Sequence, residues 1–360
     1  MKYKTAIFLI IGIIIMAVML YFIGIDEVIE ALKIANFWYI LLAIIFQIFT
    51  YYLLALRWNI VNKIANIDVG IENILPMLLV GLSINNVTPS GRGGGEPVRA
   101  YVLSKYAKKP YEETFATVIS DRALDMFPFL ILSIISVISI ILYFNLSYLL
   151  LSIIIISVIG VTVTSGLLIY MSINEKFGER ITRWVIKLVN RFYKKDPKSL
   201  EKKVMKAISG FQKTMRMMLN DKKILYHALP LSFVIWTSEI LRVYIVFSAF
   251  GVPVSPLLIG QVFILASLVG MIPLFPGGLG AIESLMIGLY SSAGITPSIS
   301  AAATVIERLI SFGMTTVIGL TILPYYGESV LDKIKFTSSN EKETAKELIE
   351  ELDYIEEHEK

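Results

Sequence analysis

The chain has 360 residues, of which 56% are hydrophobic and only 17% are charged, and its formal net charge is +4 at pH 7. Soluble domains carry roughly 25% charged residues, so this composition excludes an ordinary soluble globular protein and indicates an integral membrane protein. The chain has no cysteine, which excludes disulfides and thiolate metal sites, and its two histidines, His227 and His358, lie far apart. We therefore expect no cofactor, no metal site and no nucleic-acid partner.

Long charge-free runs of apolar residues predict the membrane spans, since a helix needs about 20 such residues to cross a bilayer. Thr5–Ile25 and Phe37–Leu56 come first, and the former lacks a small-residue cleavage site, so we expect a retained helix and not a signal peptide. Met126–Asn174 has no charged residue, and its break at Asn145–Tyr148 predicts a turn between two helices. The remaining runs are Val243–Ile282, Ser284–Ile306 and Leu309–Gly327. The runs are continuous and do not alternate, which favours an all-α, polytopic helical membrane protein over a β-barrel.

Positive charge in one loop predicts the orientation. The segment 172–226 holds 15 Lys and Arg residues against 5 Asp and Glu. Cytoplasmic loops carry such an excess, so we place this loop and both termini on the cytoplasmic side of the cell membrane. The transmembrane domain then covers residues 1–326, and an acidic tail follows at 327–360 with nine acidic residues from Glu341 to Lys360. The apolar residues of the tail have a coiled-coil spacing, which leaves pairing with a partner or a homo-oligomer open.

Two stretches of the chain share the same features in the same order. Each has a glycine-rich loop followed by a glutamate, Glu96 or Glu283, and 20 residues later an "ATVISDR" or "ATVIER" segment begins. In the first stretch, Arg57 precedes Arg122 of that segment by 65 positions. In the second, Arg242 precedes Arg308 by 66 positions. This matched order predicts an internal duplication of about 90 residues, with repeat one at about 37–145 and repeat two at about 224–325.

The relation between the repeats follows from counting spans. From a cytoplasmic N-terminus, repeat two enters the membrane from the opposite side, which predicts inverted-topology repeats. Both glycine loops break apolar segments, and irregular backbone at membrane depth is tolerated only where protein buries it or where it lines a wet cavity. We therefore predict a re-entrant helical hairpin in each repeat, and leave open whether 257–276 spans or re-enters. The predicted hinge residues are Gly91, Gly93, Gly94, Gly95, Pro276, Gly277, Gly278 and Gly280.

Charged side chains within the predicted spans are the candidate substrate-binding residues, because a charge inside the bilayer is costly and usually marks a pathway or a pair. Glu96 with Arg122, and Glu283 with Arg308, form the central set. Arginine suits a phosphate group, because its planar fork bonds two oxygens at once. The alternative is that these residues are closed structural ion pairs. The remaining candidates are Arg57, Arg92, Arg99, Asp121, Arg242 and Glu307.

Two of these candidates carry specific expectations. Asp121 points about 100° away from Arg122 around a helix, so we do not expect it to neutralise Arg122 completely. Arg99 lies just beyond the glycine loop, and we expect it at the inner membrane surface, in contact with lipid headgroups.

Enzyme motifs are absent from the sequence: there is no GxxxxGK[ST], no GxSxG and no HExxH. We predict a translocase that moves an anionic or phosphate-linked lipid headgroup between leaflets, and not an enzyme. Two alternatives stay open, a transporter of a soluble anion and a membrane enzyme of lipid or lipid-linked sugar synthesis. Without a nucleotide motif, translocation is either passive or driven by an ion gradient, with the buried glutamates as candidate proton carriers.

The stretches "PSGRGGGEPVRAYVL" and "PLFPGGLGAIESL" resemble the two signature stretches of the flippase-like membrane family related to the transmembrane region of lysylphosphatidylglycerol synthases. The resemblance covers roughly 5–325. It implies movement of a lipid headgroup between leaflets by the charged residues of the matched segments. The soluble aminoacyl-transferase domain of the bifunctional members has no counterpart in the acidic tail, so the resemblance does not extend to synthase activity.

Overall fold

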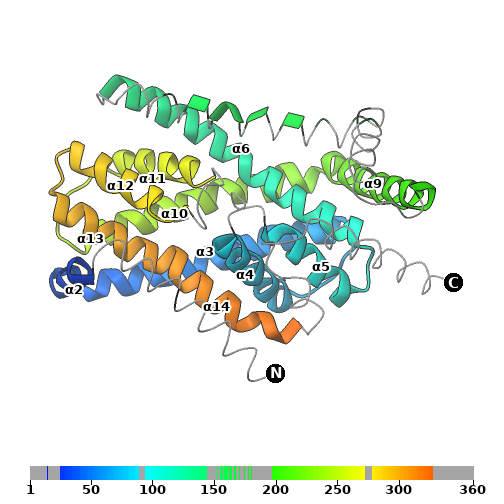
Figure 1. Ribbon diagram of the computed structural model, residues 1–360, viewed down its shortest axis with the longest axis horizontal. Helices are drawn as coiled ribbons and strands as arrows, with labels where there is room; N and C mark the ends of the chain where they lie inside the picture. Colours follow the sequence, from blue (N-terminus) through cyan, green and yellow to red (C-terminus); the bar gives the residue numbers. More distant parts are fainter. Residues whose placement is uncertain are drawn as a thin grey trace.

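The computed structural model describes residues 25–88, 94–143, 197–271 and 278–326, together with separate positions at 14 and between 152 and 180. Every regular element in these ranges is a helix (Figure 1). The first half contains α2 (Ile25–Ile34), α3 (Phe37–Ile64), α4 (Ile71–Val87), α5 (Gly95–Ala107) and α6 (Tyr111–Tyr143). The second half contains α9 (Pro197–Asn220), η1 (Ile224–Ala228), α10 (Leu229–Ser248), α11 (Pro256–Gly270), α12 (Ala281–Ser292), α13 (Pro297–Arg308), η3 (Leu309–Met314), α14 (Thr315–Ile322) and η4 (Leu323–Tyr326).

Four of the described helical stretches are long and apolar enough to cross a membrane. They are Phe37–Ile64, Tyr111–Ser139, Ile224–Ser248 and Pro297–Tyr326. Two further apolar helices are shorter: α4 has 17 residues and α11 has 15. At a rise of about 1.5 Å per residue, these two helices fall short of the hydrocarbon core, which is about 30 Å thick.

Helices α3 and α10 lie at the centre of the molecule and run antiparallel. The backbone N–H of Asn36, before α3, donates to the carbonyl of Ala249, after α10, at 2.8 Å. Halfway along, the hydroxyls of Thr50 and Ser238 are 2.8 Å apart. Near the end of α3, Arg57 Nη1 donates to Ser232 Oγ, at the start of α10, over 3.0 Å. The end of α3 therefore lies beside the start of α10, so the two helices run in opposite directions.

The helix contacts of the two halves correspond. In the first half, α4 packs against α5 and against α14 from the other half. In the second half, α11 packs against α12 and against α6 from the other half. The α4/α5 and α11/α12 pairs lie toward opposite ends of the long axis of the molecule, on either side of the α3/α10 pair (Figure 1). Each half thus contributes a short hairpin and a long helix, and each hairpin is covered by the long helix of the other half.

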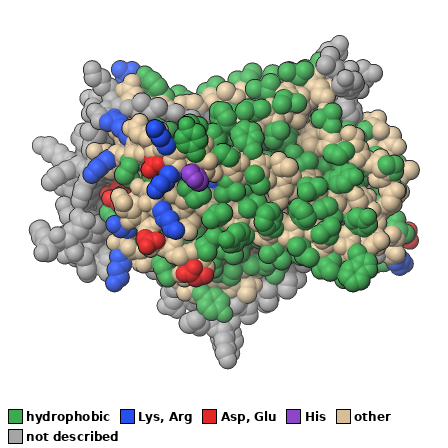
Figure 2. All heavy atoms as spheres, turned by 180° about the vertical axis from the view of Figure 1, so that it is seen from behind, with side chains coloured by type: hydrophobic (Ala, Val, Ile, Leu, Met, Phe, Trp, Pro, Cys, Tyr) green, Lys and Arg blue, Asp and Glu red, His purple; other side chains and the backbone are tan. Residues whose placement is uncertain are grey.

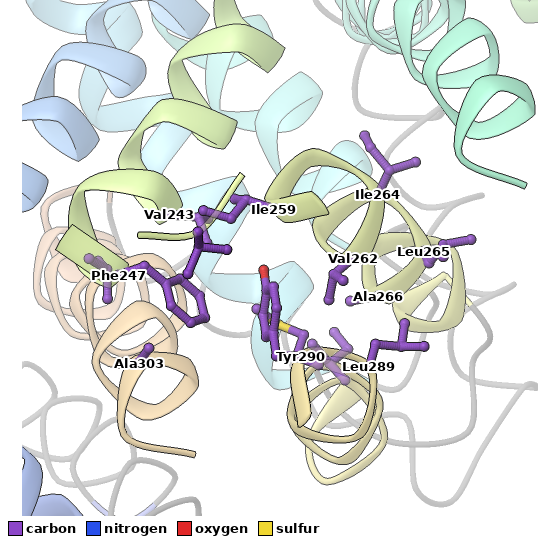
Figure 3. Close-up of a cluster of buried hydrophobic side chains, with 14 of the residues drawn as sticks. Val243, Phe247, Ile259, Val262, Ile264, Leu265, Ala266, Leu289, Tyr290 and Ala303 are labelled. Atoms are coloured by element: carbon purple, nitrogen blue, oxygen red, sulfur yellow. The ribbon is translucent and has the colours of Figure 1, made fainter. Parts of the chain in front are cut away.

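The apolar packing has one large cluster in each half, and a third, small cluster joins α6 and α9. The first-half cluster joins α3, α4, α5 and α14. The second-half cluster joins α10, α11, α12 and α13, and Figure 3 shows its Tyr290 lying beside Phe247, with the ring centroids 4.5 Å apart. Outside these clusters, large apolar side chains cover much of the face in Figure 2, while most of the visible charged side chains gather at one end. That distribution suits a molecule whose sides contact lipid hydrocarbon.

The structure agrees with the predicted all-helical class and differs in one boundary. The run Ser284–Ile306 does not form one helix, because the chain turns at Gly294, which has a φ of +93°. The next helical stretch instead continues from Pro297 through Glu307 and Arg308 to Tyr326, so both charges lie inside a candidate span. The predicted turn at 145–148 and the tail 327–360 lie outside the described residues, as do most of the first predicted span and part of the basic loop.

We expect Gly95→Ala to destabilise the α4/α5 hairpin. A Cβ on Gly95 would lie 1.9 Å from the carbonyl oxygen of Gly81, which is backbone and cannot turn aside. Overpacking of this kind costs about 1–3 kcal/mol or more, so the melting temperature in detergent should fall. Gly288→Ala in α12 is the matched control, because its Cβ meets no atom within 4 Å. Equal melting temperatures for the two variants would contradict the close approach of α4 and α5.

Candidate functional site

The first half carries a buried network of three arginines and three carboxylates. Arg57 on α3 is 1% exposed, and its Nε and Nη1 donate to Asp121 at 2.8 Å and Asp125 at 2.9 Å on α6. Arg99 on α5 donates from Nη2 to the other oxygen of Asp121 at 3.0 Å. The Arg99 guanidinium also stacks on the ring of Trp58, 4.1 Å from its centroid. Asp121 therefore fixes α3, α5 and α6 relative to one another.

The third arginine of this network joins α6 to the start of α5. Arg122 Nε donates to Glu96 Oε1, and its Nη1 lies 3.9 Å from Asp125. Glu96 is held in place by Asn85 on α4, whose Nδ2 donates to Glu96 over 3.2 Å. The Oδ1 of Asn85 accepts the backbone N–H of Gly95 at 2.6 Å. Asn85 thus bridges the two arms of the α4/α5 hairpin and orients the glutamate that pairs with Arg122.

The second half carries an equivalent arrangement. Arg242 on α10 is completely buried, and it donates to Glu307 on α13 at 3.0 Å and to Glu239 one turn earlier on α10 at 2.6 Å. Arg308 donates from Nε to Glu283 at 2.5 Å. The other Glu283 oxygen accepts the backbone N–H of Gly280 at 2.6 Å. Gly280 has a φ of +81°, a left-handed conformation that favours glycine, and it ends the loop before α12.

Two ion pairs of the first half correspond to two ion pairs of the second half. Arg57 and Asp121 correspond to Arg242 and Glu307, because each arginine lies on a central helix and each acid directly precedes the second arginine. Similarly, Glu96 with Arg122 corresponds to Glu283 with Arg308. In both cases the glutamate lies in the first turn of the second hairpin helix. The duplicated sequence pattern therefore places equivalent charges in equivalent contacts.

A cavity of about 190 Å³ lies between the two halves and receives charged groups from both. Arg122 and Asp125 reach it from α6, and Arg242 and Glu239 reach it from α10. The other polar lining residues are Gln47, Tyr51, Asn85, Asn86, Ser267, Glu307, Arg308, Ser311 and Thr315. The Arg122 side chain is 22% exposed, the most of these arginines, so its guanidinium is the most accessible from the cavity.

The structure brings most of the predicted candidates together and corrects one expectation. Arg99 does not lie at the inner surface in contact with headgroups; it is 1% exposed and paired with Asp121, because the ring of Trp58 and the carboxylate of Asp121 replace its solvation. Asp121 bonds Arg57 and Arg99, in agreement with the expectation that it does not neutralise Arg122. Gly94 and Gly95 lie at the start of α5, and Gly278 and Gly280 lie before α12, whereas Gly91, Arg92, Gly93, Pro276 and Gly277 lie outside the described residues.

Several polar residues of the site were not among the predicted candidates. Asn86 on α4 donates to the carbonyl of Phe312 at 3.3 Å and to Thr316 at 2.9 Å, so it joins the first-half hairpin to the second-half span. Phe312 belongs to η3, a π-helical segment directly after Arg308, and such segments are frequent at functional sites. The available signal was the pair of asparagines in the apolar run "GLSINNV", since an uncharged polar pair is also costly inside a membrane helix.

Comparison with known proteins places the sequence among integral membrane proteins. The family model described as "Lysylphosphatidylglycerol synthase TM region" matches residues 8–319. The chain is 50% identical to a UPF0104 membrane protein of Methanothermobacter thermautotrophicus, over 93% of the chain and 99% of the relative. It is 32% identical to a UPF0104 membrane protein of Methanocaldococcus jannaschii, over 88% of the chain and 93% of the relative. The family match includes both hairpins and both charged networks.

We expect Asp121→Asn to destabilise the protein strongly. The substitution removes the carboxylate that Arg57 and Arg99 share, and leaving a buried charge without its partner costs about 3–5 kcal/mol. The measurement is thermal unfolding in detergent. Asp68→Asn, at an exposed position after α3, serves as the control and should change stability by no more than about 0.5 kcal/mol. A small effect at Asp121 would mean that water enters the network and screens its charges.

Proposed function

The chain belongs to the lysylphosphatidylglycerol synthase TM region family, and we propose that it is a translocase that moves lipid headgroups between the two leaflets of the cell membrane. The name of the family connects it with a phospholipid. The observation that carries the proposal is the cavity between the halves, into which arginines from both halves project. The lipid tails would remain in the bilayer while the headgroup occupies this cavity.

We propose further that the two halves are inverted repeats with re-entrant hairpins. Support comes from the equivalent helices α3 and α10, which run antiparallel along their whole contact. Two copies of a module whose equivalent helices are antiparallel have opposite orientations in a membrane. The α4/α5 and α11/α12 hairpins, both too short for simple spans, lie toward opposite ends of the molecule (Figure 1). Inverted repeats with broken helices at the binding site are a common architecture for transport.

The ion pairs suggest how a phosphate group enters. Arg122 and Arg308 already have carboxylate partners, so an arriving phosphate replaces a carboxylate and leaves no guanidinium unpaired. The exchange keeps the guanidinium paired, and the displaced carboxylate then needs a proton or another hydrogen-bond donor, because an isolated buried charge is costly. Phosphate is well suited to it, because the guanidinium donates two parallel hydrogen bonds to two phosphate oxygens. The Glu96–Arg122 and Glu283–Arg308 pairs hold the hairpins in place, and binding of a headgroup would break them and free the hairpins to move.

We expect Arg122→Ala and Arg308→Ala to lower lipid exchange at least tenfold, which corresponds to about 1.4 kcal/mol of lost stabilisation in the limiting state. The assay reconstitutes the purified protein in liposomes with fluorescent phospholipids and follows bleaching of the outer leaflet. Lys63→Ala, an exposed residue at the end of α3 that does not line the cavity, is the control. Uptake of radiolabelled phosphate without lipid movement would favour a soluble-anion transporter, and chemical turnover of the lipid would favour an enzyme.

We expect single-cysteine labelling to place the two hairpins on opposite sides of the membrane. The chain has no cysteine, so each introduced thiol is unique. Lys105→Cys in the last turn of α5 and Lys222→Cys before η1 should react from the cytoplasmic side, together with both termini. Ser255→Cys before α11 and Ser298→Cys in α13, which are exposed, should react from the outside. Labelling of all four positions from one side would refute the inverted arrangement.

A further inference from the structure

The charges of the two halves do not balance in the same way. Among the described residues, the first-half network has three arginines and three carboxylates: Arg57, Arg99, Arg122, Glu96, Asp121 and Asp125. The second-half network has the two arginines Arg242 and Arg308 against the three carboxylates Glu239, Glu283 and Glu307. The second half therefore has one buried carboxylate in excess. An uncompensated charge at membrane depth is expensive, so this carboxylate needs a counterion or a proton.

The missing cation can be assigned to one position. Arg99 follows Glu96 by three residues on α5, and the residue three positions after Glu283 on α12 is Met286. Both side chains are 1% exposed, so the two positions are equivalent in burial as well as in sequence. Met286 also lines the cavity between the halves. A neutral thioether thus occupies the place where the first half has its third guanidinium.

The excess carboxylate lies in the pair around Arg242. Glu283 uses one oxygen for Arg308 and the other for the N–H of Gly280, and both contacts require a carboxylate acceptor. Glu239 and Glu307 share the single guanidinium of Arg242. Two carboxylates that share one guanidinium are less well compensated than two that are separately paired. Both line the cavity, and the Glu239 side chain is 19% exposed, against 3% for Glu307.

Among the contacts of the described residues, Glu239 has no second cation besides Arg242. The ionisable groups that line the cavity from neighbouring helices are Tyr51 on α3, Arg122 and Asp125 on α6, and Glu307 and Arg308 on α13. Arg122 is paired with Glu96 and Arg308 with Glu283, and α11 carries no ionisable residue. In the same cavity, the Oε1 atom of Gln47 is buried and has no hydrogen-bond donor within the described part of the chain. A carboxyl O–H is a donor of the kind this oxygen lacks, whereas a carboxylate is not.

We propose that Glu239 and Glu307, which share the guanidinium of Arg242, form a proton-binding site that takes up one proton through Glu239. The proton comes from water in the cavity and returns to it, so only O–H bonds form and break. The inference that this proton moves together with a lipid headgroup rests on the proposed translocase function. A phosphate that binds Arg308 from the cavity adds negative charge beside the pair, which favours uptake of the proton.

The test is infrared difference spectroscopy of the reconstituted protein while the pH is changed, because the C=O stretch of a protonated carboxyl group is separate from the carboxylate bands. We expect Glu239→Gln to remove one titrating carboxyl band. Met286→Arg supplies the missing cation and should remove the same band, whereas Met286→Leu, which adds no charge, should keep it. Asp68→Asn, at an exposed position outside the cavity, should also keep it. The near-isosteric Glu239→Gln remains informative if Met286→Arg does not fold.

The outcomes separate the proton site from the translocase. Loss of the band in Glu239→Gln and Met286→Arg supports the site, and a pH dependence of lipid exchange that these two variants lose supports coupling. The same spectra without any lipid exchange in the unmodified protein keep the proton site and reject the translocase. Spectra of Glu239→Gln that match those of the unmodified protein overturn the proton site, even if lipid exchange is observed.

Discussion

The structure depends on pairing between arginine and carboxylate groups at membrane depth. A lone guanidinium or carboxylate in hydrocarbon costs several kcal/mol, so each must find a partner from another helix. Asp121 meets this demand for α3, α5 and α6 at once, and Arg242 does so for α10 and α13. Apolar packing alone gives weak direction in a membrane, because lipid tails are as apolar as the helix surfaces. The ion pairs therefore specify which helices are neighbours.

The same pairs link the fold to the proposed transport. Glu96 and Glu283 lie in the first turns of the second hairpin helices, so each hairpin is tied to a long helix through one carboxylate. A ligand that competes for the arginine changes that connection directly. A purely structural pair would be sealed, whereas Arg122 is 22% exposed and lines a cavity. The location of the Glu96–Arg122 pair is thus better suited to exchange with an anionic group than to a permanent clamp.

The two halves of the molecule differ in the charge of their ion-pair networks. The first half is electrically balanced, while Met286 leaves the second half one cation short. The central antiparallel pair α3/α10 keeps the two networks close enough to share one cavity. In the proposed translocase, this difference in charge between the two halves would give two alternating states different affinities for protons. That difference is what any coupling between a proton and a headgroup requires.

The sequence by itself determined the membrane class, the helical composition and the pairing of each glutamate with the arginine of its own repeat, because hydropathy and matched spacing act locally along the chain. It could not place Arg99, whose position after a glycine loop suggests the surface while its real environment is Trp58 and Asp121 from two other helices. Nor could it show that Asn86 joins the halves or that Glu239 and Glu307 share Arg242. These contacts depend on how helices far apart in the sequence pack together, and only the tertiary structure decides that.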